Sequence, residues 1–179
     1  MKRTHLLIVT GLPGTGKTTL ARALARRHGA MLIAKDMIKE PLLDVLGAAD
    51  AAASRALSDA SFAILFAMAR ELAGSQCDLV LEGNFRPGQH EQPLRPLFAA
   101  HVAGAQLLCR VPESVRRARL LARARDPSRH AGHRDAELLA PAALLAGAQA
   151  DGFLELPGAR FESVQGAQDP VLDEWWQKR

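Results

Sequence analysis

The sequence predicts an α/β fold in which a mostly parallel, five-stranded sheet lies between two layers of helices. Short apolar runs of strand length alternate with longer segments whose apolar residues recur at helical spacing, an order typical of parallel sheets. A glycine-rich loop stands between the first strand and the first helix, where open sheets bind their ligands. The chain has 179 residues and neither a repeat nor a linker, so we expect a single domain over 1–179.

The first strand and the loop after it carry the most specific pattern in the chain. The apolar run Leu6–Val9 leads into residues 11–18, GLPGTGKT, which fit the phosphate-binding pattern G-x-x-x-x-G-K-[ST]. A helix follows, and Leu20, Ala23 and Leu24 are expected to form its apolar face. Strand, loop and helix therefore come in the order that the pattern requires.

The residue types of this loop indicate its chemistry. Glycines accept backbone angles that let successive N–H groups point inward, where they and the positive end of the helix surround a polyanion. The ammonium of Lys17 would reach the β- and γ-phosphates, and the hydroxyl of Thr18 would be a ligand of Mg²⁺. A glycine turn that binds nothing would not need all four fixed positions, and all four are present. We expect a nucleoside triphosphate and Mg²⁺ as cofactors, with nucleotide contacts from Gly11, Gly14, Thr15, Gly16, Lys17, Thr18 and Thr19.

The second predicted strand, Met31–Ala34, brings an acidic residue to the same edge of the sheet. Because ligands bind beyond the carboxyl ends of parallel strands, Asp36 is expected to face the transferred phosphate. Two helices follow, one over 37–47 with Pro41 in its first turns and one over 50–73. The second has a stripe that we expect to face the core, made of Ala56, Leu57, Ala60, Ala63, Ile64, Ala67 and Met68.

The rest of the chain continues the alternation of strands and helices. The third strand, Leu79–Leu81, ends at Glu82. Two further strands are predicted over 105–111 and 160–164. The remaining predicted helices begin near 92 and extend over 112–125, 135–149 and 169–178. The helix over 112–125 is expected to turn Val115, Ala118, Leu121 and Ala122 inward, and the last helix to pack Trp175 or Trp176.

Composition limits the function classes. The net charge is +4, and eight arginines crowd residues 110–134. A nucleic-acid face would explain that cluster, but aromatic residues make up only 4% of the chain and tyrosine is absent, so base-stacking platforms are few. Cys77 and Cys109 lie far apart beside apolar runs, which indicates free thiols and a cytoplasmic location. Charges interrupt the alanine-rich stretch, so we expect no membrane span.

Four stretches of the sequence carry a family resemblance. GLPGTGKTTLARALA, AKDMIKE, LVLEGNF and RARDPSRHAGH resemble the small P-loop kinases of the AAA_33 or predicted-kinase type. That group is similar to polynucleotide 5′-kinase and chloramphenicol phosphotransferase, and more distantly to gluconate and shikimate kinases. The resemblance, which extends to about residue 135, implies a three-layer P-loop NTPase fold of the nucleoside-monophosphate-kinase style. It also implies acceptor-side helices at about 37–75 and a small arginine-rich lid at about 123–135.

The resemblance implies roles for residues on the acceptor side. In these kinases an aspartate after the second strand takes the proton of the acceptor hydroxyl, and Asp36 matches it. Capping the following helix is the alternative role for Asp36. Polynucleotide kinases place an arginine three residues further on to grip the acceptor's phosphate. This chain has Lys39 there, a point charge that could equally be a solvated surface lysine.

Three residues around the end of the third strand are expected at the acceptor pocket. Glu82 would hold Mg²⁺ through water, as Asp36 also could, or would hydrogen-bond the acceptor. A carboxylate that ends a buried strand is seldom there for packing alone. Asn84 and Arg86 would line the pocket, with helix capping as the alternative for Asn84.

The resemblance assigns the arginine-rich lid to the phosphates. Arg125 and Arg129 are the expected catalytic arginines, because charge spreads over the phosphate oxygens during transfer, and Arg123 is expected at the nucleotide. Arg116, Arg117 and Arg119 are expected to form a solvated helix face. His130 and His133 also lie in the lid, and without a third ligand nearby they are expected to pack on adenine or on the lid hinge rather than to bind a metal.

Together these features predict an ATP- and Mg²⁺-dependent kinase that moves the γ-phosphate to a hydroxyl of a small molecule. Two alternatives stay open, a polynucleotide 5′-hydroxyl kinase and a non-catalytic nucleotide-binding regulatory protein. The expected partners are a nucleoside triphosphate and a small alcohol, with nucleic acid as the second option and no membrane.

Overall fold

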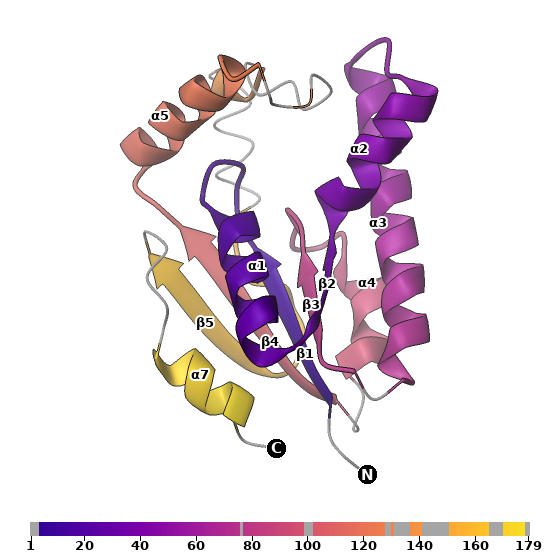
Figure 1. Ribbon diagram of the computed structural model, residues 1–179, viewed down its shortest axis with the longest axis vertical. Coiled ribbons are helices and arrows are strands. Elements are labelled where there is room, and N and C mark those ends of the chain that lie inside the picture. The colour runs from indigo at the N-terminus through magenta and orange to yellow at the C-terminus, as the bar shows by residue number, and fades with distance from the viewer. Residues whose placement is uncertain are drawn as a thin grey trace.

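The computed structural model (Figure 1) describes residues 4–75, 77–98, 102–127, 130, 137–140, 151–164 and 170–177. Within them five strands form one sheet in the order β2-β3-β1-β4-β5, and all neighbouring strands are parallel. The strands are β1 (Thr4–Thr10), β2 (Met31–Ala34), β3 (Leu79–Glu82), β4 (Val102–Arg110) and β5 (Ala159–Val164). The predicted α/β fold with a parallel, five-stranded sheet is confirmed.

Helices cover both faces of this sheet (Figure 1). On one face lie α1 (Lys17–His28) and α7 (Pro170–Gln177), and on the other α3 (Ala51–Ala73), α4 (Glu91–Leu94) and a 3₁₀ helix at Arg95–Phe98. The helices α2 (Lys35–Leu46) and α5 (Glu113–Ala124) stand beyond the carboxyl ends of the strands. Of the predicted helix over 135–149, the structure describes a 3₁₀ turn at Glu137–Leu139, and residues 141–149 lie outside the described ranges.

The central strand β1 supplies side chains to a hydrophobic core on each face. Because side chains alternate across a strand, Leu6 and Ile8 join one core while Leu7 and Val9 join the other. All four are at most 1% exposed, as expected for a strand that is covered on both sides. The predicted packing of the last helix is also confirmed, since Trp176 is buried in the core under α1 and α7.

The predicted core-facing stripe of α3 is wrong. Its buried residues are Ser54, Ser61, Phe62, Leu65, Phe66 and Ala69, whereas Ala56, Ala60, Ala63, Ile64, Ala67 and Met68 are exposed and Leu57 is half-buried. Phe62 and Phe66 bury far more apolar area than alanines can, so they set the rotation of the helix. Alanines contribute to an apolar pattern in the sequence as larger residues do. Leaving their single methyl groups in water, however, lowers the free energy of unfolding only slightly, so they do not determine which face of the helix is buried.

The inward faces of α1 and α5 also differ from prediction. In α1, Ala21 and Ala25 are buried beside Leu20 and Leu24, while Ala23 is exposed. In α5, the buried residues are Arg116 and Leu120, with Val115 half-buried and Ala118, Leu121 and Ala122 exposed. A short helix that buries an arginine cannot be oriented from its apolar residues alone.

The structure places Asp36 inside α2 rather than before it. The helix begins at Lys35 directly after β2, two residues before the predicted start, so Asp36 lies in its first turn. The N-cap position belongs to Ala34, and no side chain caps the helix there. The capping role considered for Asp36 is therefore excluded.

Among the helices that the structure describes, one is long enough and apolar enough to cross a membrane by length and composition, contrary to our expectation. This is α3, and 28% of its most apolar 18-residue window is buried within the chain. Packing helices of soluble proteins meet the same criteria.

Two substitutions in α3 test its observed rotation. Phe66→Ala should lower the free energy of unfolding by about 3–5 kcal/mol, because it leaves a cavity in the core. Ala63→Gln, on the exposed face, should change it by less than about 0.5 kcal/mol. Urea denaturation followed by circular dichroism measures both, and a large loss for Ala63→Gln with a small one for Phe66→Ala would restore the predicted stripe.

Candidate active site

The loop after β1 has the backbone shape of an anion-binding turn. Gly11, Gly14 and Gly16 have φ angles of +143°, +91° and +91°, a region that favours glycine. A Cβ atom on Gly11 would lie 2.4 Å from the carbonyl oxygen of Cys109, so β4 leaves no room for any other residue. Glycine is therefore required both by the turn itself and by the closeness of the neighbouring strand.

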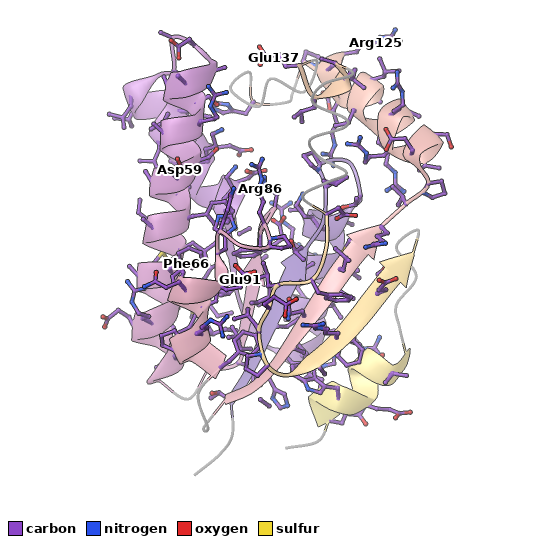
Figure 2. The ribbon with its side chains drawn as sticks, turned by 180° about the vertical axis from the view of Figure 1, so that it is seen from behind. Asp59, Phe66, Arg86, Glu91, Arg125 and Glu137 are labelled. Carbon is purple, nitrogen blue, oxygen red and sulfur yellow. The ribbon has the colours of Figure 1, made fainter. Side chains whose placement is uncertain are left out.

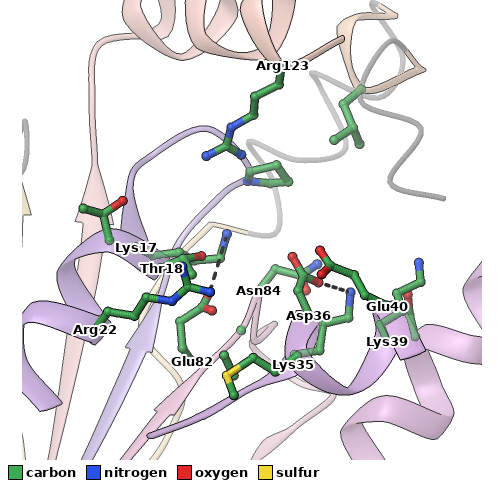
Figure 3. A pocket seen from close by; sticks show the side chains of 17 residues that line it. Lys17, Thr18, Arg22, Lys35, Asp36, Lys39, Glu40, Glu82, Asn84 and Arg123 are labelled. Atoms are coloured by element: carbon green, nitrogen blue, oxygen red, sulfur yellow. Dashed lines mark hydrogen bonds and ion pairs between the residues drawn. The ribbon is translucent and has the colours of Figure 1, made fainter. Parts of the chain in front are cut away.

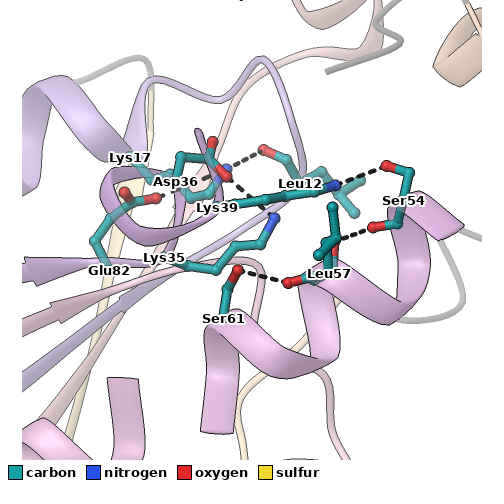
Figure 4. Close-up of polar contacts among 10 residues, drawn as sticks. Leu12, Lys17, Lys35, Asp36, Lys39, Ser54, Leu57, Ser61 and Glu82 are labelled. Atoms are coloured by element: carbon teal, nitrogen blue, oxygen red, sulfur yellow. Dashed lines mark hydrogen bonds and ion pairs between the residues drawn. The ribbon is translucent and has the colours of Figure 1, made fainter. Parts of the chain in front are cut away.

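The carbonyl of Leu12 organises the polar groups of the loop. It accepts hydrogen bonds from the Thr15 hydroxyl at 2.9 Å and from the Thr15 N–H at 3.3 Å. It also accepts from Nζ of Lys17 at 3.5 Å, and the same ammonium lies 4.0 Å from Oε1 of Glu82 (Figure 4). The cation of Lys17 is thus held at the point where the loop, α1 and the end of β3 meet.

Glu82 is a buried carboxylate beside this cation. Its exposed fraction is 2%, and burial raises the pKa of its carboxyl, while Lys17 and a hydrogen bond with Thr18 act in the opposite direction. Its Oε2 has no hydrogen-bond partner among the described residues. Mg²⁺ in proteins binds oxygen ligands and keeps several of its waters. The hydroxyl oxygen of Thr18 and the unpartnered carboxylate oxygen of Glu82 are ligands of this kind. The residues at this position fit the predicted ion.

A polar cleft of about 390 Å³ opens beyond the carboxyl ends of β1, β2 and β3. Figure 3 shows Lys17, Thr18 and Glu82 on the side of the glycine-rich loop and Asp36 and Lys39 on α2 across from them. The full lining is Pro13, Lys17, Thr18, Thr19, Arg22, Ala34, Lys35, Asp36, Met37, Lys39, Glu40, Ser58, Glu82, Gly83, Asn84, Arg123 and Leu138. Five of these side chains are cationic and three are acidic, which favours an anionic ligand.

The opposite side of the cleft is built on the first turns of α2. Nζ of Lys35 lies 3.1 Å from Oδ1 of Asp36 and holds that carboxylate at the cleft. Lys39 is 7% exposed, and its ammonium donates to the Ser54 hydroxyl on α3 at 2.9 Å (Figure 4). Burial first, and then the charge of Lys35, lower the pKa of Lys39. Lys39 is therefore not the solvated surface lysine that was the alternative.

The structure brings most of the predicted site residues to this cleft, but not all. Asn84 and Arg123 line it. Arg86 is exposed in the loop after β3, and Arg125 is exposed at the end of α5; neither lines the cleft (Figure 2). Arg129 and His133 lie outside the described residues, and Nε2 of His130 lies 2.9 Å from Oδ1 of Asp44 on α2.

Sequence reasoning missed several residues at the site. Lys35, Glu40 and Ser58 line the cleft, and Glu40 could have been found because it stands four residues, about one helical turn, after Asp36. Arg116 and Arg119, expected in solvent, contact the phosphate loop instead. The glutamate three residues before Arg116 was the available signal, since it forms a close ion pair with that arginine.

The family model for AAA_33, described as AAA domain, matches residues 6–143. Among curated proteins, the uncharacterized protein Rv2004c of Mycobacterium tuberculosis is 35% identical over 128 residues, which are 67% of this chain and 26% of that protein. The chain therefore spans about a quarter of the length of the curated relatives it matches.

Solved structures agree with that match. A proposed kinase from Chloroflexus aurantiacus is 31% identical with a TM-score of 0.85, and the likeness covers 97% of each chain. The Mycobacterium tuberculosis APS kinase CysC, in complex with AMPPNP and APS, is 20% identical with a TM-score of 0.59, over 99% of this chain and 96% of that one. The second likeness concerns the fold alone, which is that of P-loop kinases.

The burial of Glu82 leads to a prediction about pH. A carboxyl whose folded-state pKa is raised stabilises the fold at low pH, and this contribution is lost as the pH rises through the folded-state pKa. Glu82→Gln cannot ionise, so it should be more stable than the wild type at neutral pH and equally stable in acid.

Urea titrations at acidic and neutral pH measure this difference. Glu174→Gln, which changes an exposed carboxylate on α7, serves as the matched control. A Glu82→Gln protein that is less stable than the wild type at neutral pH would mean that the Lys17 ion pair outweighs burial.

Proposed function

The chain belongs to the AAA_33 family, and from this premise we propose that it is an ATP- and Mg²⁺-dependent kinase that phosphorylates a hydroxyl of a small molecule. One observation carries the proposal. A glycine-rich loop with Lys17 and an acidic residue on α2, Asp36, face each other across a single polar cleft. Kinase catalysis needs this arrangement, because it depends on positioning and on neutralising phosphate charge.

The nucleotide side of the cleft would hold the triphosphate. Backbone N–H groups within residues 11–18, where Pro13 has none, and those of the first turn of α1 would bind its oxygens, and Lys17 would move from the Leu12 carbonyl to the β- and γ-phosphates. Mg²⁺, held by Thr18 and through water by Glu82 or Asp36, would neutralise charge on those phosphates. The APS kinase that shares this fold was solved in complex with AMPPNP, which supports a nucleotide as the ligand.

The transfer itself would use Asp36 as the base. The acceptor oxygen attacks the γ-phosphorus in line, its proton passes to the carboxylate of Asp36, and the bond to the β–γ bridging oxygen breaks to release ADP. Lys35 keeps this carboxylate in place through their 3.1 Å contact. Arg123, with Arg125 and Arg129 from the proposed lid over about 123–135, would neutralise charge on the transferred phosphate.

The acceptor side favours a substrate that carries negative charge. Lys39 is buried between α2 and α3, where its ammonium donates to the hydroxyl of Ser54, and Lys35 stands one turn before it. An anionic group on the acceptor would restore the favourable solvation that burial takes from the Lys39 ammonium. Asn84 would complete the acceptor pocket. The same charges would suit the end of a nucleic acid, so a polynucleotide 5′-hydroxyl kinase is the second candidate.

The two free cysteines give information about the cellular compartment in which the protein acts. Cys77 and Cys109 form no disulfide, and Cys109 is buried, where burial raises its thiol pKa to about 12. A buried thiol with so high a pKa is inert, and both observations are consistent with the reducing cytoplasm, where we propose that the protein acts.

Two substitutions separate nucleotide binding from transfer. Lys17→Ala should abolish ATP binding measured by calorimetry, because it removes the cation at the phosphates. Asp36→Asn should bind ATP as the wild type does but lose at least about a hundredfold in transfer of the γ-phosphate, because it cannot accept the proton. Transfer is measured with radiolabelled ATP against a panel of alcohols, sugar phosphates, hydroxy acids and nucleosides. A protein that binds ATP and labels no acceptor would favour the non-catalytic regulatory role.

Salt dependence separates the two candidate acceptors. Binding of an oligonucleotide that makes several phosphate contacts should weaken steeply as salt rises from 50 to 200 mM, by roughly a hundredfold or more. We expect this chain to bind a 5′-hydroxyl oligonucleotide weakly even at the lower salt concentration, as measured by fluorescence anisotropy. Tight binding with a steep salt slope would contradict the small-molecule proposal.

A further inference from the structure

We propose that Arg116 is a positioning residue of the nucleotide site, which holds the outer edge of the phosphate loop so that its N–H groups face inward. The proposal rests on the proposed function, because it requires that the loop binds ATP. It concerns a residue on α5, outside the loop motif and outside the cleft lining.

The side chain of Arg116 is buried, and hydrogen bonds fix its orientation. Its exposed fraction is 4%, and its guanidinium forms two hydrogen bonds with the carboxylate of Glu113, at 2.7 and 3.0 Å. The third nitrogen, Nη1, donates to the carbonyl of Pro13 in the phosphate loop at 3.5 Å. A buried guanidinium is costly unless it is paired, and here a carboxylate and a loop carbonyl supply the partners.

The loop also packs tightly against the backbone of α5. A Cβ atom on Gly14 would lie 3.1 Å from Cγ of Arg116 and 3.2 Å from its carbonyl oxygen. Nη1 of Arg119, one turn further along, donates to the carbonyl of Gly14 at 3.2 Å. Two successive outward carbonyls of the loop are thus held by two arginines on one face of α5.

Holding these carbonyls fixes the direction of the N–H groups that bind phosphate. In a planar trans peptide unit, the carbonyl and the N–H that follows it point in opposite directions. The Pro13 carbonyl shares its unit with the N–H of Gly14, so a guanidinium on the outside turns that N–H toward the inside. The positive charge also polarises the unit, which strengthens the N–H as a donor to an anion.

A purely structural role makes a different prediction from a positioning role. If Arg116 only attached α5 to the rest of the chain, its loss would lower stability and leave the ATP affinity of the folded protein unchanged. If it positions the loop, its loss weakens ATP binding under conditions where the protein is fully folded. The effect should then be graded according to how well the replacement can bind a carbonyl.

The experiment compares ATP binding by calorimetry for four proteins whose folding is first checked by circular dichroism. Arg116→Met should weaken ATP binding about tenfold, as expected for the loss of a charged hydrogen bond, and Arg116→Lys should recover part of that loss. The matched control, Arg117→Met, changes the exposed neighbour on the same helix and should bind as the wild type does. No acceptor is needed in any measurement.

The results distinguish a failure of the positioning role from a failure of the proposed function. If the wild type binds ATP and Arg116→Met binds equally well, the positioning role is wrong while the proposed function stands. If the wild type binds no ATP, the proposed function and this inference both fail. If Arg116→Met does not fold, Glu113→Ala replaces it, because that exposed carboxylate orients the guanidinium; we expect about threefold weaker binding, and an unchanged affinity would overturn the proposal.

Discussion

The parallel pairing of β1 between β3 and β4 is the constraint on which the rest of the structure depends. The register sets Val9 beside Glu82 and Thr10 beside Leu108, so β1 and β3 end within one residue of each other while β4 runs two residues further, to Arg110. The N–H of Gly83 then donates to the carbonyl of Val9 at 3.2 Å, and Gly11 meets the backbone of β4. A shift of this register by one residue would turn every side chain of β1 to the other face and would separate the loop from its carboxylate.

Charge is distributed unevenly around the cleft that this register creates. The nucleotide side holds one buried acid close to Lys17, and α2 places Lys35 and Lys39 opposite it. Lys17 lies beside the carboxylate of Glu82 and Arg116 beside that of Glu113, whereas the buried ammonium of Lys39 donates to the hydroxyl of Ser54. This difference is the physical basis for assigning the anionic nucleotide to one side and an anionic acceptor to the other.

The sequence predicted the sheet and the loop well because both depend on local signals. Apolar runs located the strands, with β2 predicted at its observed bounds, and the loop pattern fixes glycines that the backbone requires. The rotation of α3 and α5 could not be predicted in this way. Alanine is too small to orient a helix against Phe62 and Phe66, and the burial of Arg116 depends on a loop carbonyl that lies about a hundred residues away in the chain.

The sharpest test is a crystal structure of the chain with Mg²⁺ and a non-hydrolysable ATP analogue. We expect the triphosphate within residues 11–18, the metal beside Thr18 on the side of Glu82, and the γ-phosphate facing Asp36 across the cleft. A triphosphate bound elsewhere, or a γ-phosphate turned away from Asp36 and toward solvent, would show that the loop and Asp36 do not form one active site.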